Sequence, residues 1–221
     1  MAAPVLPQFR PTLADLVGPR WRALPRAARI AAWAAGGLVV ALLVALAVRG
    51  GSDRTDVVVA RPVAFTLSYD ASKLVRATPE PGASLLLRTP AADRDPERFS
   101  VRPVTLPQDF GTPGAGLPLY ASRLIDEMRR ADPAFVLRGE GRARINGQPG
   151  YQILFQTVVA GDRTAYGRRT LLFKDDRTTD PGADITILAV RSLAMPNVDA
   201  VGSNGPTKLP YRSFRLGVDG P

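Results

Sequence analysis

The stretch "GRARINGQPGYQILFQTVV", residues 141 to 159, decides the fold of this chain. At its centre stand Asn146 and Gly147, a dipeptide that favours the two-residue turn of a β-hairpin. After the turn, apolar side chains recur at alternate positions, which is the pattern of a strand with one buried face. These side chains are Tyr151, Ile153, Phe155 and Val159. The stretch therefore predicts two antiparallel strands joined by a tight turn.

Other stretches on both sides of this hairpin also alternate apolar and polar residues. They read "VAFTLSYD", "ASLLLRTP" and "RFSVRPVTL" before it, and "TAYGRRTLLFKDD" and "ADITILAVRS" after it. We expect the first two to pair across a turn at residues 79–82. The third contains Pro103, which has no N–H to donate, so we expect an edge strand or a bulge there. The short loops in the second half imply antiparallel neighbours.

The stretch "LPLYASRLIDEMRRA", residues 117 to 131, is the clear amphipathic helix of the C-terminal part. Its charged residues cover one face, and Pro133 prevents its continuation. Its apolar residues cover the other face: Leu117, Tyr120, Leu124, Ile125 and Met128. Together with the strands, this helix predicts an α+β fold, a twisted antiparallel sheet with the main helix packed on it.

The stretch "IAAWAAGGLVVALLVALAV", residues 30 to 48, contains no charged residue. A helix of this length is about 28 Å long, close to the roughly 30 Å of a bilayer core. We interpret it as an uncleaved transmembrane helix that precedes the α+β domain; a secretory signal cleaved after Ala47 is the alternative. Five arginines precede it and two follow closely, which favours a cytoplasmic N-terminus and an extracytoplasmic C-terminal domain.

The predicted organisation has four parts. A cytoplasmic segment rich in proline and arginine covers residues 1–29, the single-pass transmembrane helix 30–48, a linker 49–62, and the extracytoplasmic domain 63–217. The formal net charge is +9, and much of it comes from arginines beside the span, which we expect to lie against the lipid bilayer. No basic cluster with interleaved aromatic residues indicates a nucleic-acid partner.

The chain has no cysteine and no histidine. This composition excludes disulfide bonds, a histidine-based catalytic triad and the usual zinc sites. Acidic residues cluster in "KDDRTTDPGAD" (174–184) and "DRDPER" (93–98), but neither spacing matches a calcium loop, so we interpret both as solvated loop charges. "GTPGAG" (111–116) lacks the lysine of a phosphate-binding loop. We therefore name no catalytic, cofactor-binding, metal-binding or ligand-binding residue, and no cofactor.

In this order, the stretches resemble the PsbP-like domains, a family that includes the LpqN lipoproteins of high-GC bacteria. The resemblance covers residues 63–216 and lies in the strand that ends in Ser68 and Tyr69, the central helix, the turn "INGQPGY" and the closing "SFR". LpqN-type members carry a lipid-modified cysteine where this chain has a helical anchor. The family's helix before "SFR" is expected to be short or absent here, because glycines and prolines interrupt that stretch. The resemblance implies binding and assembly rather than catalysis.

We therefore expect a membrane-anchored, extracytoplasmic binding or assembly module of the cell envelope that docks a protein partner or an amphiphile. One alternative is a structural membrane component that associates through its span, where small residues at i,i+4 spacing permit a weak homodimer. The other is a carboxylate-dependent envelope hydrolase, since two acidic groups alone can hydrolyse a glycosidic bond. The sequence identifies no ligand.

Overall fold

The chain divides into two compact units, Met1–Gly51 and Ser52–Pro221, and the fold described below is that of the second. The computed structural model describes eight single positions between 25 and 41, and residues 53–90, 96–175 and 181–217. Within these described residues, no helix is both long enough and apolar enough to cross a membrane. Most of the predicted anchor at 30–48 lies outside them, so the anchor stays a prediction.

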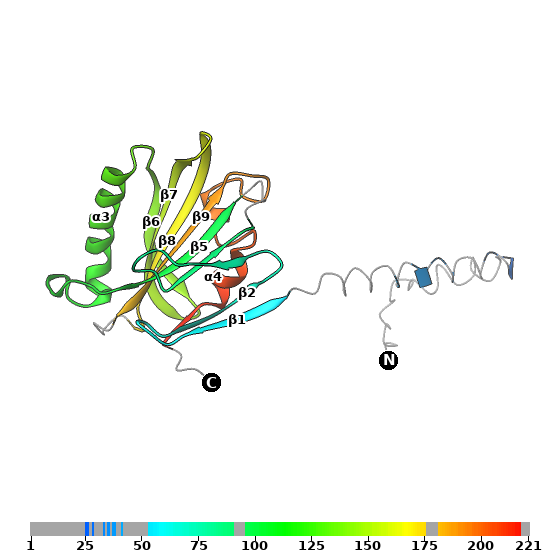
Figure 1. The fold of residues 1–221 in the computed structure, drawn as a ribbon, viewed down its shortest axis with the longest axis horizontal. Coiled ribbons are helices and arrows are strands. Elements are labelled where there is room, and N and C mark those ends of the chain that lie inside the picture. The colour runs from blue at the N-terminus through cyan, green and yellow to red at the C-terminus, as the bar shows by residue number, and fades with distance from the viewer. Residues whose placement is uncertain are drawn as a thin grey trace, which may run out of the picture. The chain divides into compact units, whose positions relative to one another are not determined.

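Two antiparallel sheets build the second unit (Figure 1). The small sheet has the strand order β1-β2-β10, and the large sheet has the order β3-β4-β5-β9-β8-β7-β6. The strands are β1 (Arg54–Val59), β2 (Phe65–Asp70), β3 (Val75–Ala77), β4 (Leu85–Arg88), β5 (Glu97–Val104), β6 (Val136–Ile145), β7 (Gln148–Val159), β8 (Arg163–Leu172), β9 (Gly182–Val190) and β10 (Arg215–Leu216). The helices are η1 (Gln108–Phe110), α3 (Pro113–Ala131), η2 (Val198–Ala200) and α4 (Lys208–Ser213). The predicted α+β class is confirmed for this unit.

Strands β6 and β7 form the predicted hairpin around Asn146 and Gly147. The φ angles of these two residues are 48° and 83°, in the left-handed region that asparagine and glycine tolerate best. Arg142 on β6 lies opposite Tyr151 on β7, so both side chains project from the same face of the sheet. β6 is the last strand of the large sheet, and its arginines therefore line an open edge.

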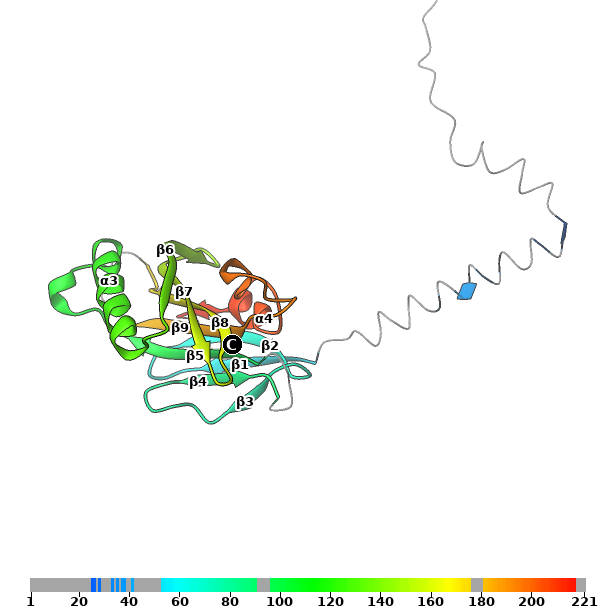
Figure 2. The same cartoon turned by 90° about the horizontal axis from the view of Figure 1, so that it is seen from above.

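Helix α3 packs on one face of the large sheet, beside β6 and β7 (Figures 1 and 2). It begins at Pro113, four residues earlier than predicted, because proline suits the first turn of a helix. The buried face of α3 and the sheet residues beneath it form one hydrophobic cluster, made of Val104, Leu106, Leu117, Ala121, Leu124, Ile125, Ile153, Leu171 and Phe173. The predicted burial of Leu124 and Phe155 is confirmed, since their exposed fractions are 5% and 6%.

The other face of the large sheet packs against the small sheet and α4, which enclose a second hydrophobic core. Phe65 on β2 stacks on Phe214 with ring centroids 5.2 Å apart, and both side chains are fully buried. The hydroxyl group of Tyr211 on α4 lies 3.1 Å from that of Thr170 on β8. α4 has only six residues, so the expectation of a short closing helix is confirmed. The expectation of one sheet is corrected to two.

Three other features differ from the expectations. β2 pairs with β1 and β10, whereas β4 pairs with β3 and β5, so the predicted pairing across residues 79–82 is wrong. β5 is not an edge strand but lies between β4 and β9. It tolerates Pro103 because β4 pairs only with residues 98–101, and no strand on that side needs an N–H at 103. β1 lies within the expected linker 49–62, where Val57 is buried.

Candidate binding site

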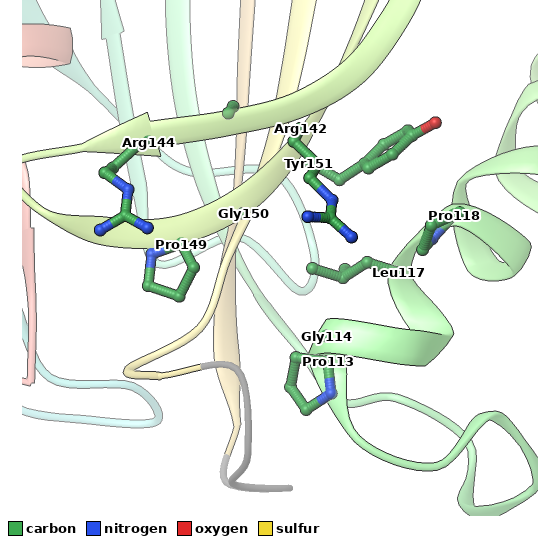
Figure 3. Close-up of a pocket in the computed structure, with 10 residues that line it drawn as sticks. Pro113, Gly114, Leu117, Pro118, Arg142, Arg144, Pro149, Gly150 and Tyr151 are labelled. Carbon is green, nitrogen blue, oxygen red and sulfur yellow. The ribbon is translucent and has the colours of Figure 1, made fainter.

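A pocket of about 290 Å³ lies between the first half of α3 and the β6–β7 hairpin (Figure 3). Its lining residues come from three elements: Pro113, Gly114, Leu117 and Pro118 from α3, Arg142, Ala143 and Arg144 from β6, and Pro149, Gly150 and Tyr151 from β7. Figure 3 shows the guanidinium group of Arg142 extending from β6 towards Leu117 of α3, and that of Arg144 lying beside Pro149 of the hairpin. The pocket therefore combines two cations with an apolar wall.

The hairpin register explains why both arginines reach the pocket. Alternate residues of a strand project from the same face, so the side chains at 142 and 144 leave β6 together. Arg142 lies opposite Tyr151, and Arg144 lies opposite Pro149. This is the face on which α3 packs. Leu117 of α3 is 5% exposed and supplies the apolar side of the pocket.

Gly150, one of the lining residues, allows β7 and β8 to pack closely behind the pocket. A Cβ atom at Gly150 would lie 2.2 Å from the carbonyl oxygen of Leu171 on β8, closer than any side chain can approach. The absence of a side chain lets β7 lie tightly against β8 at this point. This close approach positions the two neighbouring lining residues, Pro149 and Tyr151.

Arg142 and Arg144 are exposed, and neither takes part in an ion pair between the described residues. Nη1 of Arg144 donates a hydrogen bond of 3.1 Å to the carbonyl oxygen of Gly147, which orients its guanidinium group. The pKa of Tyr151 is raised by burial and by the neighbouring carboxylate of Glu140, so its phenol stays neutral at physiological pH. Two arginines beside an apolar wall can bind a carboxylate that is attached to an apolar group.

The acidic stretches of the sequence do not form a metal site in the described part of the chain, where no group of three metal-ligating side chains occurs. Asp176, Asp180, Asp93 and Asp95 lie outside the described residues. Glu97 was expected to be a solvated loop charge, and this is wrong. Its side chain is 6% exposed and accepts hydrogen bonds from the backbone N–H and hydroxyl group of Thr207, because β5 passes beneath the loop that leads to α4.

Asp184, the last residue of the acidic stretch, was also expected to be a solvated loop charge, and this too is wrong. It lies in β9, is 4% exposed and forms an ion pair with the partly buried Arg169, on the face of the large sheet that α3 covers. Nη2 of Arg169 lies 2.6 Å from Oδ2 of Asp184, and Nε lies 3.0 Å from both carboxylate oxygens. Burial lowers the pKa of Arg169, but the charge and hydrogen bonds of Asp184 outweigh it, so the pKa is raised. Burial also raises the pKa of Tyr120. Each charge of this pair satisfies the other, so we assign it a structural role.

No family model and no curated protein matches the chain. Among solved structures, cyanobacterial PsbP (CyanoP) from Synechocystis is similar, with 18% identity and a TM-score of 0.48, over 76% of this chain and 94% of that one. LpqN of Mycobacterium tuberculosis, described as involved in cell envelope biogenesis, has 14% identity and a TM-score of 0.47, over 74% and 91%. The Ran-binding protein Mog1p of Saccharomyces cerevisiae has 11% identity and a TM-score of 0.45, over 75% and 96%.

The resemblance to PsbP-like and LpqN-like domains that was noted in the sequence is thus confirmed. At these identities the likeness concerns the fold alone. The binding site comes from the chain's own geometry. Leu117 and Tyr151 were expected only as apolar positions of the helix and the strand, and the sequence assigned no lining residue to a site. The alternation in "RARI" (142–145) places two arginines on one face of a strand, and this pattern was the one sequence feature that pointed to the site. Nothing in the sequence joined them to Leu117, which lies 25 residues earlier.

Proposed function

We propose that this chain is a membrane-anchored, extracytoplasmic binding module of the cell envelope. In this proposal, the domain holds an acidic segment of a partner protein in the pocket between α3 and the β6–β7 hairpin, and it performs no catalysis. The observation that carries the proposal is the pair of exposed guanidinium groups, Arg142 and Arg144, beside an apolar wall and outside the ion pairs of the described residues.

The volume of the pocket favours a protein segment over an amphiphile. About 290 Å³ lies just below the roughly 300–1,000 Å³ that ligand pockets span. This space accommodates one or two side chains, whereas a lipid with two acyl chains needs more. An aspartate or glutamate next to an apolar residue satisfies both parts of the pocket, because arginine binds carboxylates in a bidentate geometry and Leu117 offers apolar contact.

The proposed location rests on the sequence. Nineteen uncharged residues at 30–48 and the arginines before them support a single-pass anchor with the domain outside the cytoplasm. A partner would then be an envelope protein close enough to the membrane for the anchored domain to contact it. The weak homodimer through the span stays an alternative, and so does a carboxylate-dependent hydrolase.

Site-specific photocrosslinking in cells tests the pocket. A photoreactive amino acid replaces Leu119, which is 63% exposed and adjacent to the lining residue Pro118. The full chain should then crosslink to a specific protein. The double variant Arg142→Glu and Arg144→Glu should lower the yield at least about tenfold, because each hydrogen bond to a charged group is worth about 1.5–3 kcal/mol.

The matched control is a second double charge reversal, Arg76→Glu and Arg88→Glu. These residues are exposed and lie on β3 and β4, at the opposite edge of the large sheet from β6. The control should leave the crosslink unchanged. Equal loss in both double variants, or no loss in either, would contradict the pocket as the binding site. Co-purification of a lipid that the pocket variant no longer retains would support the amphiphile instead.

A further inference from the structure

Basic side chains also gather around α4. Three shallow depressions meet at this helix, and Arg212 lines all three of them. Five exposed basic residues line these depressions without lining the candidate pocket, and we call them the α4 surface: Arg54, Lys73, Lys208, Arg212 and Arg215. In Figure 1, α4 lies beside β2, and the start of β1 belongs to the same region.

The α4 surface has more positive than negative charge. Its depressions are lined by two acidic residues, and each has a partner within the surface. Arg54 lies 3.7 Å from Asp56, and Lys73 lies 3.2 Å from Asp70. The other three basic residues take part in no ion pair between the described residues. An excess of three positive charges therefore faces solvent.

The chain connects this surface closely to the predicted anchor. β1 begins at Arg54, six positions after Val48, the last residue of the predicted span. A fully extended chain covers at most about 3.6 Å per residue, so this connection holds Arg54 within roughly 22 Å of the bilayer core. Val58, which is 52% exposed, lines the same depression as Arg54 and Arg215 and adds an apolar contact.

We infer that the α4 surface binds the anionic phospholipid headgroups of the bilayer in which the chain is anchored. This inference rests on the proposed anchoring. Basic residues next to an anionic membrane are attracted to it within about one Debye length, roughly 8 Å at physiological ionic strength. Such binding holds the domain against the membrane in one orientation. It leaves α3 free for a partner, because α3 lies on the other face of the large sheet from α4, although Arg144 lines both the candidate pocket and one of the α4 depressions.

Fluorescence quenching in nanodiscs tests the inference on the full chain. The chain has no cysteine, so Ser203→Cys introduces a unique labelling site at one of the α4 depressions. Ser122→Cys, at an exposed position on α3, gives the matched control. Each labelled chain is reconstituted with a lipid that carries a headgroup quencher. One set of nanodiscs contains phosphatidylglycerol, and the other contains only phosphatidylcholine at the same ionic strength.

The label at 203 should be quenched in the anionic nanodiscs, and the label at 122 should not. Each basic residue next to an anionic surface strengthens binding roughly fivefold, so Arg212→Glu with Arg215→Glu should weaken the contact at least about 25-fold. The double variant Arg76→Glu and Arg88→Glu should have no such effect. The inference would be overturned if quenching at 203 were the same in anionic and neutral nanodiscs, or the same with and without Arg212→Glu and Arg215→Glu. Loss of quenching in millimolar inorganic phosphate, at constant ionic strength, would overturn it in favour of a small-anion site.

Alkaline carbonate extraction of membranes that contain the chain tests the anchor separately. A chain that resists extraction supports the anchor whatever the quenching shows. A chain that is extracted contradicts the anchor. Flotation with phosphatidylglycerol vesicles then tests, independently of the anchor, whether the α4 surface binds anionic lipid. Flotation that fails, or that persists with the reversal at α4, would overturn the inference in that case too.

Discussion

Gly167 on β8 should be a position where even a methyl group destabilises the domain. It lies directly opposite Phe155 of β7, and the aromatic ring covers the place where a side chain would stand. A Cβ atom at Gly167 would lie 2.0 Å from Cζ of Phe155, whereas ordinary contacts of a Cβ atom begin near 3.4 Å. The ring would have to retreat by about 1.4 Å, the difference between these distances.

The ring cannot retreat freely, because it is packed on its other side. Phe155 stacks on Phe135 with centroids 5.6 Å apart and an angle of 27° between the planes. Inserting a methyl group into such a packed site costs about 1–3 kcal/mol. We therefore expect Gly167→Ala to lower the free energy of unfolding by that amount. Without the ring, the same change should stabilise by about 0.5–1 kcal/mol, because glycine in a strand is less favourable than alanine.

A double-mutant cycle measures this difference. Phe155→Ala alone should cost about 3–5 kcal/mol, and adding Gly167→Ala to it should recover part of the loss. The coupling energy should then be about 1.5–4 kcal/mol, the sum of the two effects of the methyl group. Gly141→Ala on β6 is the matched control, because a Cβ atom there meets nothing within 4 Å.

Unfolding in guanidinium chloride should be followed by far-UV circular dichroism. Both tryptophans of the chain, Trp21 and Trp33, precede the domain, so their fluorescence does not report its unfolding. If Gly167→Ala costs nothing, or costs the same with and without the ring of Phe155, the packing argument is refuted.

Three further predictions concern buried groups of the same domain. Leu124→Ala should lower the free energy of unfolding by about 2–5 kcal/mol, measured by denaturation, since Leu124 is 5% exposed; a near-neutral effect would contradict its place in the core. Arg169→Met alone should cost about 3–5 kcal/mol because it leaves Asp184 buried without a partner, whereas Arg169→Met with Asp184→Leu should be close to neutral; equal costs would contradict this reading of the ion pair. The hydroxyl group of Ser72 donates to Asp70 and lowers the pKa of that carboxyl group despite its burial. The ionised carboxylate of Asp70 should therefore stabilise the fold fully above the ordinary pKa of 3.8, and this stabilisation should be lost as the pH falls below that value. Asp70→Asn should flatten the acid side of a stability–pH profile.

The local elements of this fold could be predicted because short-range chemistry decides them. Asn146 and Gly147 need no tertiary context to favour a tight turn, and the helix before Pro133 shows its buried face in its own periodicity. Strand pairing could not be predicted in the same way, because alternation reveals a buried face but not the partner strand. β4 was therefore assigned to the wrong neighbour, and β1 was mistaken for a linker although Val57 faces a core.

The candidate site could not be predicted from the sequence for a related reason. Its arginines lie on an edge strand, where charged side chains are also what protects an open edge from unwanted pairing. Taken alone, Arg142 and Arg144 therefore fit that protective role as well as a binding role. The position of α3 distinguishes the binding role from the protective role. The helix begins at Pro113, so Leu117 lies beside the hairpin and lines a pocket together with Arg142 and Arg144.

Arg138 stands on the same strand but outside the pocket, and it shows the difference. Its Nε donates a hydrogen bond of 3.1 Å to Oε1 of Gln156 on β7. Arg138 is itself the residue at which the pairing of β6 with β7 shifts, between Leu137 and Gly139. Edge protection alone would make the three arginines of β6 equivalent. The structure instead places two of them in the lining of the pocket and binds the third to a side chain of the neighbouring strand, and this difference along one strand is the argument for recognition at the pocket.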